Sequence, residues 1–289
     1  MKQLSLIGIG LIGGSLAAGL RTVGQVERVT ACARRQETLD TARYLQLIDD
    51  GSTDLASAIA GADMVVLAVP MGAYREVFSA LKPIWPEHAV VTDAGSSKLS
   101  VIEDARAVFG HVPSNFVPGH PVAGTEKSGP AAAIADLFRH RRVILTPQDD
   151  TSAAALQAVR AMWESVGAQV HVMSAQHHDE VLALTSHLPH VIAYQLIETL
   201  ARLDDQREIF SFAAGGLKDL TRIASSNPQM WTDIMMANDT AVLEGLDRYI
   251  EDLQALRELL AAGDAERVLA HFERAKNARD QWIHTAEAS

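Results

Sequence analysis

A single histidine in a segment rich in glycine and proline is the first candidate for chemistry in this sequence. The segment covers residues 119–129 and reads GHPVAGTEKSG, with His120 as its one imidazole. Glycine and proline predict a tight, irregular path, and holding such a path costs conformational entropy that a plain connector would not need. We therefore predict that His120 is held in a site as an acid or base, a role that suits imidazole near neutral pH.

A second candidate is the pattern G-x-G-x-x-G, formed by Gly8, Gly10 and Gly13. The first glycine permits a tight turn, the second lets the backbone approach a pyrophosphate, and the third lets a helix pack close to a strand. The free N–H groups at the start of that helix would face the phosphates. Any α/β protein can carry one glycine-rich turn, but here a strand-like run precedes it and a helical run follows. This context favours dinucleotide binding.

The end of the next strand, at residues 28–32, bears on which dinucleotide binds. In NAD-binding proteins an acidic residue about 20 residues after the glycines binds the ribose 2′-OH. Ala33 stands at that place here, and Arg34 and Arg35 follow it. Two guanidinium groups without a carboxylate suit a 2′-phosphate. The sequence thus predicts NADP, with NAD as the alternative cofactor and a solvated loop as the alternative reading of the arginines.

Two more loops follow predicted strands and are candidates for the site. One contains Val69 and Pro70, and the other contains Ser96, Ser97 and Lys98. Ligands of parallel sheets bind beyond the carboxyl ends of the strands, so both loops are expected to face cofactor or substrate. The serines could instead cap the helix expected over residues 98–109.

Strand and helix patterns alternate through residues 1–173, which predicts an α/β fold with a Rossmann-type, doubly wound parallel sheet. The expected strands are 4–7, 28–32, 62–70, 89–93, 142–147 and 168–173, and the last of them closes the sheet. From residue 174 the strand signals stop. Helical spacing then predicts an all-helical domain over residues 174–289. Its broad apolar faces need partners, so we expect a homodimer.

Two segments of the helical half carry polar candidates. Pro189 separates His187 from His190, which predicts a kink or a helix end there; His190 is the better site candidate, and His187 suits a buried core. Lys218 and Arg222 lie four residues apart on one helix face, where they could bind a carboxylate or form a solvated surface pair. No acidic or sulfur ligand completes a cluster with the histidines, so no metal is expected.

Composition limits the classes of partner. The 289 residues carry a formal net charge of −11, whereas nucleic acids and anionic membranes require a basic face. Cys32 is the only cysteine, which leaves no disulfide framework and fits a reducing cytoplasm. No apolar run reaches the ~18 residues of a membrane span, and no signal peptide is expected before the first strand.

Together, these motifs resemble those of the prephenate and arogenate dehydrogenases of tyrosine biosynthesis. The shared motifs are GIGLIGGS at 8–15, D-x-G-S-x-K at 93–98, GHPxAGTE at 119–126, SHLPH at 186–190, and KDxTRIA at 218–224 followed by PxMW at 228–231. The resemblance implies a Rossmann domain followed by a helical dimerisation domain. It also implies a cytoplasmic NAD(P)-dependent enzyme that oxidises and decarboxylates prephenate, arogenate or both, and the choice of substrate stays open.

The resemblance assigns roles to residues within these motifs. His120 becomes the catalytic histidine and Ser96 supports it, while Leu11 and Ile12 join the glycines in binding the cofactor. The residues assigned to the substrate are His190, Arg222, Lys218, Thr125 and Glu126.

Two other functions fit parts of the sequence. A β-hydroxyacid dehydrogenase also joins a Rossmann half to a helical half, but it depends on a catalytic lysine, and the sequence around Lys218 does not fit that role. A non-catalytic NADP-sensing protein would bind cofactor without turnover, and His120, Ser96 and Arg222 argue against it. We expect neither a regulatory domain nor a fused mutase at the ends of the chain.

Overall fold

The computed structural model describes residues 1–287 of the chain, which contacts divide into two compact units. The first unit is Met1–Ala241, and the second begins at Val242. This division by contacts falls later in the chain than the boundary expected near residue 173, which stays a prediction. The segment that follows residue 173 packs against the sheet, because Ala175 and Ile234 lie in the same buried cluster as Leu67.

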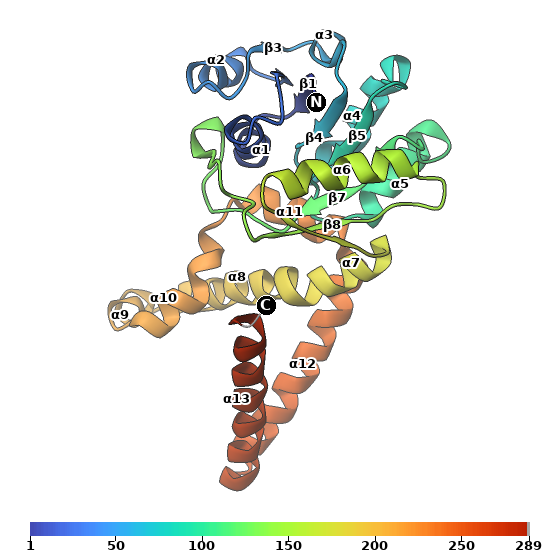
Figure 1. Cartoon of the computed structure of the whole chain (residues 1–289). Helices are drawn as coiled ribbons and strands as arrows, with labels where there is room; N and C mark the ends of the chain where they lie inside the picture. Colours follow the sequence, from blue (N-terminus) through green and yellow to red (C-terminus); the bar gives the residue numbers. More distant parts are fainter. Residues whose placement is uncertain (288–289) are drawn as a thin grey trace. The chain divides into compact units, whose positions relative to one another are not determined.

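The larger sheet of the first unit has six parallel strands in the order β3-β2-β1-β4-β5-β6. Figure 1 labels β1, β3, β4 and β5 of this sheet. The strands are β1 (Gln3–Ile7), β2 (Arg28–Cys32), β3 (Asp50–Ser52), β4 (Met64–Leu67), β5 (Val90–Asp93) and β6 (Phe116–Val117). This is the order of doubly wound dinucleotide-binding folds, in which ligands bind where the strand order reverses, beside the carboxyl ends of β1 and β4. The predicted Rossmann-type fold is confirmed.

Helices cover both faces of this sheet, which explains why its central strands are unbroken apolar runs. Val66 of β4 packs into one buried layer with Leu16 of α1. Val65 packs into the opposite layer with Phe78 of α4. Full burial of one such side chain is worth about 1.5–3 kcal/mol. The helices of this part are α1 (Leu11–Thr22), α2 (Gln36–Tyr44), α3 (Leu55–Ile59), α4 (Tyr74–Leu81), α5 (Leu99–Phe109) and α6 (Ala153–Ser165).

A second, three-stranded sheet follows the first along the chain. Its strand β7 (Gly119–Pro121) pairs antiparallel with β8 (Arg142–Leu145), and β8 pairs in parallel with β9 (Gln169–Val172). The expectation that residues 168–173 close the doubly wound sheet is therefore wrong. Pro118 directly follows β6 and has no N–H with which to continue a ladder. Its carbonyl instead accepts a hydrogen bond from the N–H of Thr146, which directly follows β8.

His120 lies in strand β7, not in the irregular loop predicted for residues 119–129. It pairs with Ile144 of β8. Because β7 is an edge strand, Pro121 is tolerated there: its missing N–H would face no second neighbour. The irregular path begins only after this strand, and residues 124–128 are exposed.

Helices make up the rest of the first unit. They are α7 (Ala175–Leu182), α8 (Leu188–Ala201), α9 (Gln206–Ser211), α10 (Gly215–Thr221) and α11 (Pro228–Ala237). The interruption predicted near Pro189 is confirmed as a π-helical turn, Ala183–His187, which joins α7 to α8. Pro189 stands in the first turn of α8, where its missing N–H is tolerated. Turns of this kind occur frequently at functional sites.

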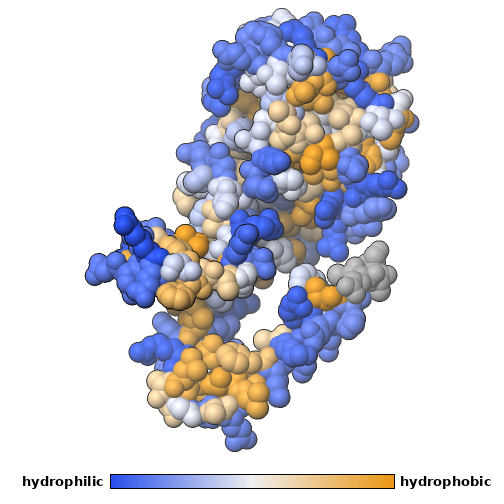
Figure 2. Space-filling model, turned by 90° about the vertical axis from the view of Figure 1, so that its left-hand side faces the viewer, coloured by the Kyte–Doolittle hydropathy of each residue, from blue (hydrophilic) through white to orange (hydrophobic). Residues whose placement is uncertain are grey.

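The second unit is a helical hairpin. Helix α12 (Asp239–Ala261) leads into it, and a turn with Gly263 at φ +67° joins α12 to α13 (Ala265–Glu287). Figure 2 shows an apolar area at the turn end of the hairpin, at the bottom of the view; Leu260 and Leu269 are each 59% exposed. Within residues 1–287, no helix combines the length and apolar character needed to cross a bilayer.

Candidate active site

The glycine loop between β1 and α1 leaves room for a phosphate. Gly8 has φ +95°, and a Cβ on it would meet the Ala68 carbonyl oxygen at 2.3 Å. A Cβ on Gly13 would meet the Gly8 carbonyl oxygen at 2.5 Å, whereas a Cβ on Gly10 would meet nothing within 4 Å. Gly10 is the N-cap of α1 and provides no side-chain cap. The N–H groups in the first turn of α1 are therefore free of a side-chain cap. The open space beside them fits the pyrophosphate of a dinucleotide.

The other predicted cofactor residues of this region lie beside the glycine loop. Leu11 and Ile12 form the first turn of α1 and are half-buried. In the loop after β4, Val69 is half-buried and Pro70 is exposed. The two segments adjoin because the N–H of Ala68 donates a hydrogen bond to the last residue of β1. The structure therefore brings these predicted residues together at the point where the strand order reverses.

Arg34 and Arg35 follow the carboxyl end of β2, the strand next to β1. Both side chains are exposed, and Arg35 is the N-cap of α2. Within residues 1–287 neither arginine forms an ion pair, although Arg21, Arg28 and Arg43 nearby all pair with aspartates. Their guanidinium groups are thus free to bind an anion.

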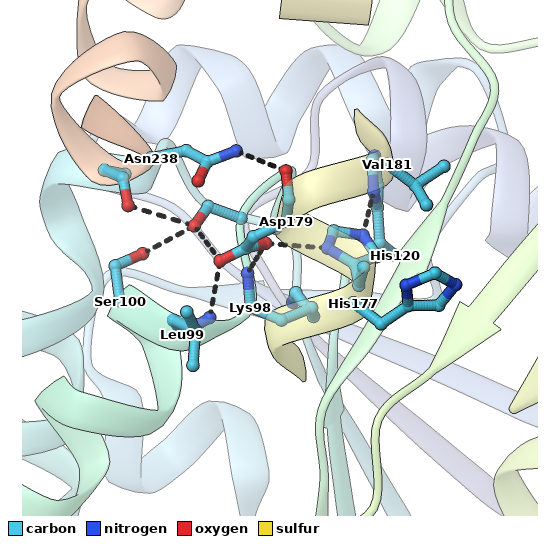
Figure 3. A network of polar contacts seen from close by, with 12 residues as sticks. Lys98, Leu99, Ser100, His120, His177, Asp179, Val181 and Asn238 are labelled. Carbon is cyan, nitrogen blue, oxygen red and sulfur yellow. Dashed lines mark hydrogen bonds and ion pairs between the residues drawn. The ribbon is translucent and has the colours of Figure 1, made fainter. Parts of the chain in front are cut away.

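His120 is the first member of a buried chain of hydrogen bonds. Its Nδ1 lies 2.8 Å from Nε2 of His178, and Nδ1 of His178 lies 2.7 Å from Oδ1 of Asp179. The carboxylate of Asp179 also accepts the N–H groups of Lys98 at 2.8 Å and Leu99 at 2.9 Å. Figure 3 shows these contacts converging on Asp179. Helix α7 carries the second histidine and the aspartate, so it supplies the partners of the β7 base.

These contacts determine which nitrogen of His120 carries a proton. Two backbone N–H groups can only donate, so Asp179 is an ionised acceptor and His178 must donate from Nδ1. A neutral His178 then has a bare Nε2, which accepts a hydrogen bond from Nδ1–H of His120. Nε2 of His120 is therefore unprotonated, and no hydrogen bond to it is found among the described residues. The chain of contacts makes Nε2 a base.

Burial and charge keep the two imidazoles neutral. Burial lowers the pKa of His120 well below its usual value, and His178, Lys98 and His187 lower it further. Burial also lowers the pKa of His178, against the opposing effect of its hydrogen bond to Asp179. Burial alone would raise the pKa of Asp179, but hydrogen bonds from His178, Lys98 and Leu99 hold it below its usual value. A neutral base beside a fixed anion can accept a proton.

Ser96 was expected to support His120. In the structure it is the neighbouring Ser97 that contacts the hydrogen-bonded network, at Asp179. The hydroxyl of Ser97 donates to Oδ2 of Asp179 at 3.0 Å. Ser96 is half-buried and forms no hydrogen bond among residues 1–287. A role for Ser96 beside bound substrate or cofactor stays a prediction.

His187 belongs to the interior of the site. It is 1% exposed, and its Nδ1 accepts a hydrogen bond from Nδ2 of Asn238 at 3.1 Å. The same amide group donates to the carbonyl of Asp179 at 2.9 Å. Burial lowers the pKa of His187 to about 4. It is a neutral, hydrogen-bonded core residue, in agreement with the buried position that its sequence context suggested.

His190 and Arg222 lie near each other at the edge of the helical segment. Nδ1 of His190 donates to the carbonyl of Ser186 at 2.8 Å, and its ring stacks on Trp231 with centroids 3.4 Å apart. Burial lowers the pKa of His190, and Arg222 is close enough to lower it further. Arg222 is exposed and begins a 3₁₀ turn after α10. The pair can present an imidazole and a guanidinium to an anionic ligand.

The remaining predicted substrate residues are exposed. Lys218 lies on α10, and Thr125 and Glu126 lie in the segment after β7. The hydroxyl of Thr125 accepts the N–H of Lys127 at 3.2 Å. No hydrogen bond or ion pair of the described residues joins any of the three to His120. Their contacts with substrate stay predictions.

Comparison with known proteins identifies the family. The model "Prephenate dehydrogenase, nucleotide-binding domain" matches residues 16–172, and "Prephenate dehydrogenase, dimerization domain" matches residues 174–274. The chain belongs to the prephenate dehydrogenase family. It is 41% identical to the cyclohexadienyl dehydrogenase of Zymomonas mobilis, over 96% of this chain and 95% of that one. It is 35% identical to the prephenate dehydrogenase of Bacillus subtilis, over 97% and 76% of the two chains.

Solved structures of this family have the same fold. The prephenate dehydrogenase from A. aeolicus, in complex with hydroxyphenyl propionate and NAD+, has a TM-score of 0.90 at 34% identity and covers 97% of this chain and 98% of its own. The arogenate dehydrogenase of Synechocystis has a TM-score of 0.81 at 29% identity, with 97% and 99% covered. As a member of this family, the chain is an NAD(P)-dependent dehydrogenase.

The site of this family member contains residues that the sequence motifs did not point to. His178 and Asp179 carry the hydrogen-bond chain, and their only sequence signal is the run of polar residues at 177–180. Asn238 lies in none of the motifs that the sequence analysis singled out. Within residues 1–287, no group of three or more His, Cys, Asp and Glu residues could hold a metal ion.

Proposed function

We propose that this chain catalyses the oxidative decarboxylation of prephenate, of arogenate, or of both, with NADP as the preferred cofactor. The products would be 4-hydroxyphenylpyruvate from prephenate and tyrosine from arogenate. The observation that carries the proposal is the chain of hydrogen bonds from Asp179 through His178 to His120. It leaves an unprotonated nitrogen, Nε2 of His120, to take a hydroxyl proton.

The proposed reaction begins at C4 of the substrate ring, which carries a hydrogen and a hydroxyl group. Bound NADP supplies the hydride acceptor for the C4 hydrogen. Nε2 of His120 takes the hydroxyl proton, so that the O–H electron pair forms the C4 carbonyl. The bond between the ring and its carboxylate then breaks, CO2 leaves, and the electron pair makes the ring aromatic. The C4 oxygen recovers a proton to become the phenol.

His178 and Asp179 stabilise the protonated base during this step. When His120 becomes an imidazolium, its Nδ1–H still donates to His178, and the negative charge of Asp179 lies one ring away. Charge-assisted hydrogen bonds of this kind are worth about 1.5–3 kcal/mol each. The hydrogen bonds from His120 through His178 to Asp179 thus stabilise the imidazolium charge, which burial alone would destabilise.

The cofactor preference follows from the end of β2. Ala33 provides no carboxylate for a ribose 2′-OH, and the exposed Arg34 and Arg35 are free to bind a 2′-phosphate. The glycine loop between β1 and α1 would bind the pyrophosphate of NAD and of NADP equally. Preference for NADP therefore depends on the two guanidinium groups.

Prephenate is a dianion, so its binding site requires cationic side chains. Arg222 presents a guanidinium that can bind a carboxylate bidentately, and His190 adds an imidazole beside it. Lys218, Thr125 and Glu126 complete the proposed substrate contacts. A carboxylate such as Glu126 would favour the amine of arogenate over the ketone of prephenate.

We also infer a homodimer, which the matched dimerization domain at residues 174–274 supports. The α12–α13 hairpin exposes large apolar side chains that a partner would cover. They include Leu243, Ile250, Leu253, Leu260, Leu269, Phe272 and Trp282. The cytoplasmic location expected from the single cysteine stays a prediction.

A reduced-nicotinamide absorbance assay tests the proposed function. The chain is mixed with prephenate or arogenate, each with NAD or NADP, and the absorbance of the reduced cofactor is followed. Turnover of at least one substrate, faster with NADP, is the expected result. Cofactor binding without turnover of either substrate would contradict the proposal and favour the NADP-sensing alternative.

A further inference from the structure

A fully buried ion pair lies behind the strand that carries His120. Asp93 ends β5 and Lys98 directly precedes α5, and both side chains are 0% exposed. Burying two charges costs free energy that apolar residues of the same size would not cost. The reaction proposed above uses neither residue. Their contacts therefore call for a separate explanation.

The ion pair holds both polar groups of Gly119, the residue before His120. Nζ of Lys98 donates to the carbonyl of Gly119 at 2.7 Å, and the N–H of Gly119 donates to Oδ1 of Asp93 at 2.9 Å. The approach of the two segments is close, because a Cβ on Gly119 would meet the backbone carbonyl oxygen of Asp93 at 3.2 Å. Strand β7 is an edge strand with one neighbour, so the ion pair supplies anchoring that a second strand would otherwise provide.

The carboxylate of Asp93 is itself oriented by two more donors. The hydroxyl of Tyr74 donates to Oδ2 at 3.0 Å, and the N–H of Gly95 donates to the same oxygen at 2.8 Å. With Lys98 and Gly119, Asp93 thus accepts hydrogen bonds from four groups. Its position relative to Gly119 is therefore strongly constrained.

We propose that Asp93 and Lys98 are positioning residues, which fix the peptide before His120 and so hold its imidazole in register with His178 and the substrate. The inference rests on the proposed function for the proton that His120 receives. A displacement of about 1 Å at a reacting group can cost about 100-fold in rate, so precise positioning of His120 can offset the cost of burying two charges.

Lys98 also contributes through its charge. The groups that act on His120 are His178 of α7, His187 of the π-helical turn and Lys98, and each of them lowers its pKa in addition to burial. Asp179 reaches His120 only through His178. The ammonium group thus helps to keep the base neutral while its hydrogen bond holds the backbone.

Three variants of the full-length chain test the inference: Lys98→Met, Asp93→Asn, and the neutral pair Asp93→Asn with Lys98→Met. Each is expected to lower kcat by about 10- to 100-fold, with the dissociation constant of NADP changed by less than about twofold. Amide exchange at Gly119 should accelerate in the neutral pair. The pKa of His120, followed by ¹⁵N NMR, should rise in Lys98→Met, and Asp93→Asn should not reproduce this rise. Lys82→Met is the matched control, because exposed Lys82 also donates to a backbone carbonyl, that of Val108.

The neutral pair keeps the test decisive if the single variants do not fold, because it leaves no uncompensated buried charge. Wild-type kcat, wild-type exchange at Gly119 and an unchanged pKa of His120 in that variant would overturn the inference. The NMR and exchange measurements need no turnover. A wild-type chain that oxidises neither substrate would therefore refute the proposed function without deciding the role of Asp93 and Lys98.

Discussion

Nδ1 of His120 donates to Nε2 of His178 across 2.8 Å, although the two residues are 58 positions apart in the chain. One lies on the edge strand of the small sheet and the other on the first helix after it. The contact leaves the opposite nitrogen of His120 unprotonated, because His178 is held by Asp179.

Replacing His120 with asparagine should lower kcat by about 10²- to 10⁴-fold, the usual contribution of general acid–base catalysis. Asparagine keeps a polar group in β7 but cannot accept the proton. Substrate binding should persist, as measured by calorimetry with prephenate and the oxidised cofactor. Turnover close to that of the wild type would remove His120 from the role of base.

Replacing Asp179 with asparagine should lower kcat by about 10²- to 10⁴-fold as well, by analogy with other histidine–carboxylate pairs. The amide can donate to Nδ1 of His178, which reverses the tautomer of both histidines and leaves a proton on Nε2 of His120. Glu180→Gln is the matched control, since Glu180 is an exposed neighbour on the same helix. Equal rates in the two variants would contradict the tautomer assignment.

The stability of the fold should fall between pH 6.5 and about 4. Burial lowers the pKa of His187 from 6.5 to about 4, so in this interval the unfolded chain binds a proton that the folded chain does not. The contribution is fully present above pH 6.5 and is lost as the pH falls through about 4. It amounts to about 3 kcal/mol of unfolding free energy. Urea unfolding at several pH values measures it. His187→Gln should reduce the dependence, to which the lowered pKa values of His120 and His178 also contribute, whereas the exposed-site variant His88→Gln should leave it unchanged.

Replacing Arg222 with alanine should raise the substrate KM by about 10- to 100-fold, because a charge-assisted hydrogen bond to a carboxylate is worth about 1.5–3 kcal/mol. The effect on kcat should be smaller, since the guanidinium binds substrate and transition state alike. Steady-state kinetics with prephenate measure both constants. Arg207→Ala, at another exposed position of the helical segment, serves as the control. An unchanged KM for Arg222→Ala would show that this side chain does not bind substrate.

Replacing Arg34 and Arg35 together with serine should reduce the preference for NADP over NAD by about 10-fold or more, since each contact of guanidinium with phosphate is worth about 1.5–3 kcal/mol. The ratio of kcat/KM for the two cofactors measures the preference. The constants for NAD should change little, because its ribose carries no 2′-phosphate. A double variant with the wild-type ratio would indicate that the two arginines are only a solvated loop.

Local sequence patterns were sufficient for the parts of this fold that depend on near neighbours. The limits of β2 agree with the expected residues, and α5 begins one residue after the start of the helix expected over residues 98–109, because an apolar run or a helical stripe defines each of them. β3 and β6 have only three and two residues, too few to produce a periodic pattern. Their place in the sheet depends on pairing with β2 and β5.

The candidate site divides in the same way. The glycine pattern identified the cofactor loop, because its requirements are met by the backbone within a few residues. The motif around His120 pointed to the proposed base, but the hydrogen-bond partners of this histidine come from elsewhere in the chain. No sequence motif marks His178, Asp179 or Asn238, since their part in the site depends on contacts between α7, the start of α5 and the end of α11.

By itself, the sequence determined the class of fold and the family, and it pointed to the glycine loop and to His120 as site candidates, because each of these depends on residue types at short spacing. Only the tertiary structure decided that His120 lies in a strand, and which of its nitrogens is free. That choice depends on two backbone N–H groups at the start of α5, which make Asp179 an acceptor and orient His178. The donor and acceptor roles of these side chains depend on contacts between elements that are distant in the sequence, so no local pattern of residues encodes them.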